Sequence, residues 1–207
     1  MSVVIQIGKC YFIGMTDKLG SKEKTILAAA KLLRRRGYHD TALSDILEAA
    51  GSPRGSLYFH FPKGKEEIAV AALTSAAEAV RRAIAGAAAT SKSADEFLIR
   101  IIRSMVADLE RSDFREGCPI ALTALEMSGA SEALTETARA AFQSWEREIA
   151  AGLEPFASNP ARARPLATAV LSQLEGALLL ARTYQHLEPM QRAEEPIRIL
   201  VRAFLES

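Results

Sequence analysis

This chain of 207 residues is poor in cysteine, with two residues of that type, and it has no long uninterrupted apolar run. Cys10 and Cys118 lie far apart and match no metal-ligand or disulfide spacing, which fits a reducing compartment. Gln173 and Glu175 interrupt the most apolar C-terminal stretch, so we expect no membrane span. The sequence therefore predicts a cytoplasmic protein with no membrane partner.

Histidine is scarce as well, with three residues in the whole chain. His39, His60 and His186 lie in no recognisable nucleophile, metal or phosphate-loop motif. An enzyme is therefore a remote alternative, and we expect neither a cofactor nor a metal site.

Alternating β-branched runs are nearly absent, while Ala, Leu, Glu and Arg dominate, so the class predicted is all-α. Turn and cap signals divide the chain into helices of two to six turns. The expected helices run from the cap residue Ser21 to Gly37, over Asp45–Ala50 after the cap residue Ser44, over Arg54–Phe61, over about Lys65–Ala87, from the capping box Ser93–Glu96 to about Arg111, from Pro119, from Ser131 to about Leu153, from Asn159 to about His186, and from Pro189 to about Phe204.

Charge is distributed unevenly, although the formal net charge is only +1. Residues 15–65 hold ten Lys or Arg against five Asp or Glu, and residues 66–207 hold fifteen against twenty. A basic N-terminal part joined to an acidic body is expected if one end of the molecule meets phosphates. Ordinary variation of charge along a chain is the alternative at this point.

The segment Thr41–Lys65 carries the most informative motif, because two short helices meet there around Gly51 as a helix-turn-helix requires. Apolar residues are available to pack the two helices together, namely Ile46, Ala50, Leu57 and Phe61. The other face of the second helix presents donors and flat rings that packing does not need: Arg54, Gly55, Ser56, Tyr58, Phe59 and His60. Such groups suit contacts with phosphates and base edges.

At these residues the sequence resembles the TetR family, whose signature runs from a threonine through an Ala-Gly turn to Gly-x-Leu-Tyr-x-His-Phe and a lysine. The extra residue in Pro62–Lys65 and the tripeptide Gly117-Cys118-Pro119 resemble the LmrA/YxaF subgroup. The resemblance implies an N-terminal three-helix DNA-binding domain followed by a larger helical domain for ligand binding and dimerisation. The domains expected are residues 15–64 and 65–207, with residues 1–14 as a hypothetical extension.

The predicted DNA-binding residues combine those that the resemblance implies with Ser56, whose hydroxyl suits a phosphate. They are Thr41, Ser44, Arg54, Gly55, Ser56, Tyr58, Phe59, His60 and Lys65. Phe59 stands where many relatives have tyrosine, which removes one phosphate-binding hydroxyl and offers a ring to a thymine methyl. Packing or capping roles remain open for Tyr58, His60, Thr41 and Ser44. Arg34–Arg36 is more readily interpreted as a solvated helix end than as a base-reading element.

In the acidic body, two apolar helical stripes suggest a four-helix dimer interface, with a buried monomer core as the alternative. The interface residues predicted are Val170, Leu174, Leu178, Ile197, Leu200, Val201 and Phe204. A mixture of soft, aromatic and polar side chains predicts a pocket for a small apolar or aromatic effector. Its residues are Phe97, Ile101, Met105, Cys118, Leu122, Met127, Phe142, Trp145, Gln173 and Tyr184, with Glu175 as a further polar group.

The function expected is a ligand-responsive repressor that binds a palindromic operator in double-stranded DNA as a homodimer. Activation in place of repression stays open, and a non-specific architectural DNA-binding protein is the main alternative. A redox role for Cys118 is the less favoured interpretation of that residue, because a single free cysteine is more often inert.

Overall fold

A computed structural model describes residues 19–205, apart from the side chains of Arg54, Ser56 and Phe204. The described residues form helices and no strands, and the all-α prediction is confirmed. Their contacts divide them into two units. The head unit comprises residues 19–79 and 118–141, and the body unit comprises residues 80–117 and 142–205. The hypothetical extension 1–14, with Cys10, lies outside the described residues, and the predicted boundary after residue 64 stays a prediction.

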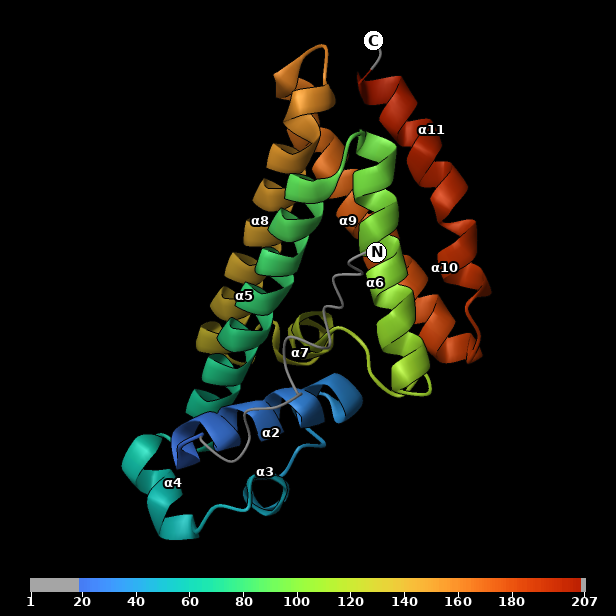
Figure 1. Cartoon of the computed structure of the whole chain (residues 1–207). Helices are drawn as coiled ribbons and strands as arrows, with labels where there is room; N and C mark the ends of the chain where they lie inside the picture. The colour runs from blue at the N-terminus through green and yellow to red at the C-terminus, as the bar shows by residue number, and fades with distance from the viewer. Residues whose placement is uncertain (1–18, 206–207) are drawn as a thin grey trace. The chain divides into compact units, whose positions relative to one another are not determined.

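The head unit is built from six helical segments (Figure 1). They are α2 (Ser21–Arg36), α3 (Leu43–Ala50), α4 (Arg54–His60), the part of α5 (Lys65–Thr90) up to residue 79, α7 (Pro119–Met127), and the part of α8 (Glu132–Leu153) up to residue 141. Helix α2 packs against α3, α4 and α7. The head unit therefore contains α7 and the start of α8 in addition to the three N-terminal helices.

Glycines end the first two helices of the head unit, as predicted. Gly37 and Gly51 follow α2 and α3 with φ of 77° and 60°, a backbone conformation that glycine adopts without steric cost. Both predicted N-caps are wrong. Helix α2 begins after Gly20 and helix α3 after Ala42, and neither helix receives a side-chain cap. The Ser21 hydroxyl instead donates to the hydroxyl of Ser52, at 3.2 Å.

The body unit holds the remaining helical segments of the described chain (Figure 1). They are the end of α5, α6 (Ala94–Arg111), the end of α8, the 3₁₀ turns η2 (Glu154–Phe156) and η3 (Pro160–Arg162), α9 (Ala163–Tyr184), α10 (Glu188–Arg192) and α11 (Glu194–Leu205). Helix α9 contacts α6, α10 and α11. Large side chains fully buried in this unit include Phe97, Leu98, Ile102, Leu109 and Ile149.

The single last helix predicted from Pro189 is two helices, α10 and α11, which break at Ala193. Pro196 explains the break. Proline has no N–H to give to the carbonyl of Arg192, and its ring would clash with that carbonyl in a continuous helix. Proline is tolerated in the first turn of a helix, which is where α11 places it. Among residues 19–205, no helix has both the length and the apolar character needed to cross a bilayer.

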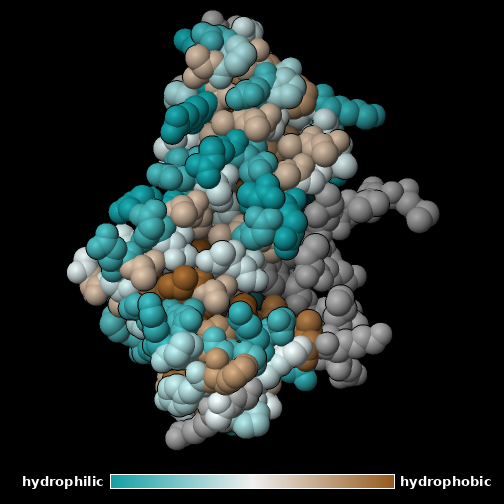
Figure 2. Space-filling model, turned by 90° about the vertical axis from the view of Figure 1, so that its left-hand side faces the viewer, coloured by the Kyte–Doolittle hydropathy of each residue, from teal (hydrophilic) through white to brown (hydrophobic). Residues whose placement is uncertain are grey.

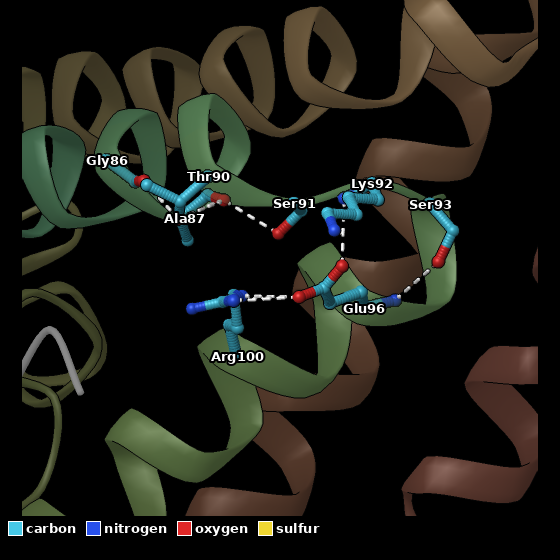
Figure 3. A network of polar contacts seen from close by, with 8 residues as sticks. All are labelled: Gly86, Ala87, Thr90, Ser91, Lys92, Ser93, Glu96 and Arg100. Carbon is cyan, nitrogen blue, oxygen red and sulfur yellow. Dashed lines mark hydrogen bonds and ion pairs between the residues drawn. The ribbon is translucent and has the colours of Figure 1, made fainter. Parts of the chain in front are cut away.

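The connection between α5 and α6 shows how local hydrogen bonds fix a helix start (Figure 3). The Ser93 hydroxyl accepts the N–H of Glu96 at 3.1 Å, as the predicted capping box requires. The Glu96 carboxylate accepts the N–H of Lys92 at 2.8 Å, one residue earlier than in the standard box, and pairs with Arg100 at 2.7 Å. The hydroxyls of Thr90 and Ser91 donate to the carbonyl of Ala87 at the C-terminal end of α5.

The Glu96 contacts make a pH-dependent contribution to stability. The hydrogen bond from Lys92, and then that from Arg100, holds the pKa of Glu96 below its usual value. A depressed carboxyl pKa stabilises the folded state above the pKa of the unfolded chain, and this contribution is lost as pH falls through the folded pKa. We expect E96Q to lower the urea midpoint slightly at pH 7, with the difference from wild type vanishing in acid. Equal midpoints at pH 7 would contradict this assignment.

Candidate nucleic-acid interface

Helices α3 and α4 meet in a tight turn at Gly51. Its N–H donates to the carbonyl of Glu48, and the N–H of Ser52 donates to that of Leu47, both at 3.1 Å. Pro53 follows in an extended conformation and precedes the first residue of α4. Gly51, in the left-handed conformation, thus ends α3. Pro53 has no backbone N–H and cannot extend α3, so α4 begins after it as a separate helix.

The inner faces of α3 and α4 are packed into the head unit. Ile46, Leu57 and Phe61 are buried, as predicted, whereas Ala50 is only half-buried. Helix α4 has only seven residues, so its stability comes from this packing rather than from intrinsic propensity. The buried Leu57 and Phe61 fix which side of α4 faces outward.

The outer face of α4 exposes two aromatic rings. Tyr58 is 57% exposed and Phe59 is 82% exposed. Leu125 is the other large hydrophobic residue of the head unit that is exposed among the described residues. The half-buried His60 lies edge-to-face with Phe59, the ring centroids being 5.0 Å apart. At Gly55 a Cβ would meet no atom within 4 Å, so this backbone is open to a partner. Rings and backbone left in water in this way are a typical contact surface.

The other predicted DNA-binding residues occupy different environments. Thr41 is buried, and its hydroxyl donates to the carbonyl of Gly37 at 2.7 Å, so its side chain belongs to the core of the head unit. Ser44 is exposed and lines an open hollow of about 410 Å³ together with the residues of the Gly51 turn. Arg54 and Ser56 begin α4, but their side chains lie outside the described part of the structure.

Lys65 begins α5 beside the turn between α2 and α3. Its amine lies 4.2 Å from the centroid of the Tyr38 ring and 3.4 Å from the carbonyl oxygen of His39. Partial burial lowers the pKa of Lys65, against the raising effect of Glu126 and Asp40. Burial also raises the pKa of Tyr38, with Glu66 adding to the effect. The contacts with Tyr38 and His39 thus position the Lys65 amine in the protein without DNA.

The basic run at the end of α2 is only partly solvated, because Arg34 and Arg35 are half-buried. Arg36 is exposed and pairs with Asp45 of α3 at 2.7 Å. This surface pair contributes about 1 kcal/mol or less to stability.

The hydropathy of the residues on one face of the molecule is shown in Figure 2, where hydrophilic residues predominate and hydrophobic residues lie in small separated areas.

The residues predicted for an effector pocket divide between the two units. Seven lie in the body unit, where Phe97, Ile101 and Trp145 are buried, Met105, Phe142 and Gln173 are half-buried, and Tyr184 is exposed. The other three, Cys118, Leu122 and Met127, lie in the head unit, where the Cys118 sulfur accepts the N–H of Ala121 at the start of α7. Gln173 and Tyr184 line an open groove of about 430 Å³ along α9 and α10.

Four of the predicted dimer-interface residues are buried within their own chain, namely Val170, Leu174, Ile197 and Val201. Residues already buried have little area left to lose in a dimer, and this favours the alternative interpretation as monomer core for these four. Leu178 and Leu200 are half-buried, and the side chain of Phe204 lies outside the described part. Among the side chains that the structure describes, the large apolar ones that the same helices expose are Leu179, Leu180, Tyr184 and Ile199.

A glycine-ended helix, a short turn and a second helix with an exposed aromatic face are typical of a helix-turn-helix DNA-binding protein. Comparison with known proteins agrees. Residues 26–72 match the model of bacterial regulatory proteins of the tetR family, and residues 94–196 match the LmrA/YxaF-like transcriptional regulator C-terminal domain.

Relatives align over most of the chain. This chain is 32% identical to the uncharacterized HTH-type transcriptional regulator YxaF of Bacillus subtilis, and the alignment covers 91% of this chain and 98% of the relative. It is also 32% identical to the HTH-type transcriptional regulator LmrA of the same species, over 82% and 90%. The chain belongs to the TetR family of transcriptional regulators, with an LmrA/YxaF-like C-terminal domain. This family and these relatives are regulators and not enzymes.

Solved structures share the fold. A TetR transcriptional regulator from Chloroflexus aurantiacus is 30% identical, with a TM-score of 0.71 over 87% of this chain and 93% of that one. A TetR transcriptional regulator from Legionella pneumophila has a TM-score of 0.78 at 22% identity, over 87% and 97%. The second likeness, at this low identity, concerns the fold alone.

Proposed function

We propose that this regulator is a ligand-responsive repressor that binds a palindromic operator as a homodimer in the cytoplasm. The observation that carries the proposal is the outward face of α4, where Tyr58 and Phe59 are exposed beside the open backbone of Gly55. The basic composition of residues 15–65 supports it, because phosphate contacts supply much of the affinity for DNA. The DNA-contact set proposed is Ser44, Arg54, Gly55, Ser56, Tyr58, Phe59, His60 and Lys65.

The mechanism proposed is steric. In a dimer, two copies of α4 separated by about 34 Å, one turn of DNA, enter successive major grooves. An effector that binds one conformation of the protein more tightly shifts the population toward it. If α5 swings in that conformation, the two copies of α4 no longer match the groove spacing and the operator is released.

Selection from a random pool of DNA duplexes, followed by footprinting of the recovered sequence, tests operator binding. A repressor recovers one palindrome and protects two half-sites about 10 base pairs apart. An architectural protein recovers no consensus and protects any duplex in a salt-dependent way. A reporter gene placed behind the recovered site then separates repression from activation, since repression requires expression to rise when the regulator is deleted.

The exposed apolar side chains of α9 and α11 are the dimer surface that we propose. Leu179, Leu180 and Tyr184 line one end of α9, and Ile199 is exposed on α11. At Gly176 of α9 a Cβ would meet nothing within 4 Å, which permits close approach of a second helix. These residues take the place of the buried stripe that the sequence predicted.

We expect L180D to convert a dimer into a monomer in analytical ultracentrifugation, because each interface would bury two new charges without partners. Specific operator affinity should fall with it, since a monomer contacts one half-site. L125D is the matched control, because Leu125 is a similarly exposed leucine on α7 of the head unit. A wild-type monomer, or an L180D protein that remains dimeric, would contradict this surface.

The effector proposed is a small apolar or aromatic molecule bound in the body unit. Support comes from aromatic and soft side chains of this unit, Ile101, Met105, Phe142 and Trp145. Phe142 and Trp145 lie edge-to-face with ring centroids 5.5 Å apart, a geometry that suits an aromatic guest as well as core packing. A thermal-shift screen that found only strongly anionic ligands would overturn the proposal.

A further inference from the structure

The carboxylate of Glu126, near the end of α7, is bound to the turn between α2 and α3. Its Oε2 accepts the backbone N–H of Tyr38 and, at 3.1 Å, that of His39. The preceding residue, Gly37, has a positive φ, and a Cβ built on it would collide with this carboxylate. The turn therefore leaves room for Glu126, which satisfies two N–H groups that lie beyond the end of α2.

A second contact holds the neighbouring part of the same segment. The hydroxyl of Ser131 donates to the carboxylate of Glu66, in the first turn of α5, at 3.0 Å, and it accepts the N–H of Leu134. Ser131 is buried. The α7–α8 corner, which we define as residues 126–131, is thus bound both to the α2–α3 turn and to the start of α5.

Lys65 directly precedes Glu66, and its amine contacts the α2–α3 turn to which Glu126 is bound. The residues that hold its amine, through the ring of Tyr38 and the carbonyl of His39, are the two whose N–H groups bind Glu126. We propose that Glu126 is a positioning residue for DNA binding, which fixes the α2–α3 turn and thereby the amine of Lys65 and the start of α3. The proposal rests on the operator binding proposed above.

Positioning and simple electrostatics predict effects of opposite sign. A carboxylate close to a phosphate-binding lysine repels DNA, so its removal should strengthen binding if charge alone decided the outcome. If the hydrogen bonds to Tyr38 and His39 position the turn, removal should weaken binding despite the lost repulsion. Glu132 is exposed at the start of α8, and its side chain has no hydrogen bond or ion pair among the described residues, so it offers a control for charge alone.

The test compares E126A, E126Q and E132Q on the duplex recovered by random selection, with fluorescence anisotropy as the measurement. We expect E126A to lose about tenfold or more in affinity, as expected for charge-assisted hydrogen bonds. E126Q should retain more affinity than E126A, since one amide oxygen can accept both N–H groups. E132Q should bind as tightly as wild type or slightly more tightly. Wild-type or tighter binding by E126A would overturn the proposal.

Two further readouts separate positioning from a general loss of folded protein. In E126A, hydrogen exchange should accelerate at the amides of Tyr38 and His39, and the slope of log affinity against log salt should fall by about two, one for each half-site of the dimer, as the two Lys65 contacts are lost. Weaker binding with an unchanged slope and unchanged exchange would overturn the role assigned to Glu126. Failure of the wild-type protein to select any duplex would instead reject the proposed function.

Discussion

Replacing Tyr58 and Phe59 together with alanine should weaken specific operator binding about 100-fold or more, because each lost base or phosphate contact costs about 1–3 kcal/mol and a dimer loses two sets. The fold should survive. Both side chains are largely exposed, so their removal leaves no cavity, while the buried Leu57 and Phe61 still pack α4. Anisotropy with the selected duplex measures the affinity, and urea denaturation measures stability.

The matched control for this double variant is L125A, which removes an exposed apolar side chain from α7 of the same unit. It should bind the operator as wild type does. Retained affinity in the Tyr58 and Phe59 double variant, with the protein folded, would contradict the assignment of α4 as the recognition helix. A large loss of stability in that variant would contradict the exposed positions of the two rings.

F97A should lower the free energy of unfolding by about 3–5 kcal/mol, the usual cost of removing a phenyl ring from a packed core. Phe97 is fully buried in the body unit. A Cβ added at Gly152 would lie 2.6 Å from the ring of Phe97, which shows how closely the helix around Gly152 approaches it. Urea denaturation is the measurement, with the midpoint and the slope recorded separately.

F97L is the control for F97A, since it keeps most of the apolar volume and should cost less. If Phe97 instead lined a preformed effector pocket with open space beside it, F97A would cost much less than this range. A loss below about 1 kcal/mol would therefore contradict the close packing and favour the predicted pocket role.

Local signals made the helix-turn-helix predictable from the sequence. Gly51 ends α3 and Pro53 precedes α4 because these residue types have restricted or special backbone conformations that act within a few positions. The predictions that Ser21 and Ser44 cap these helices also relied on local signals, and they were wrong. A capping side chain permits a helix to start after it, but packing in the head unit starts α2 and α3 at residues that follow Gly20 and Ala42.

Contacts between distant residues could not be predicted in this way. Glu126 lies 88 positions from Tyr38, and no pattern around either residue indicates that they meet. The apolar stripes of the body unit show a different limit. Helical periodicity identifies the apolar face of a helix but does not say whether the same chain or a second copy covers it, so the assignment of Val170 and Leu174 to a dimer interface stays a prediction, although both are buried within their own chain.

Site-specific crosslinking would show whether the outward face of α4 contacts the bases of DNA. A photoreactive benzoylphenylalanine placed at residue 59 keeps an aromatic group at a position of α4 whose native side chain is 82% exposed. We predict crosslinks to bases in both half-sites, about one turn of DNA apart, and none from the same group at residue 125. Specific operator binding without any crosslink from residue 59 would contradict this prediction.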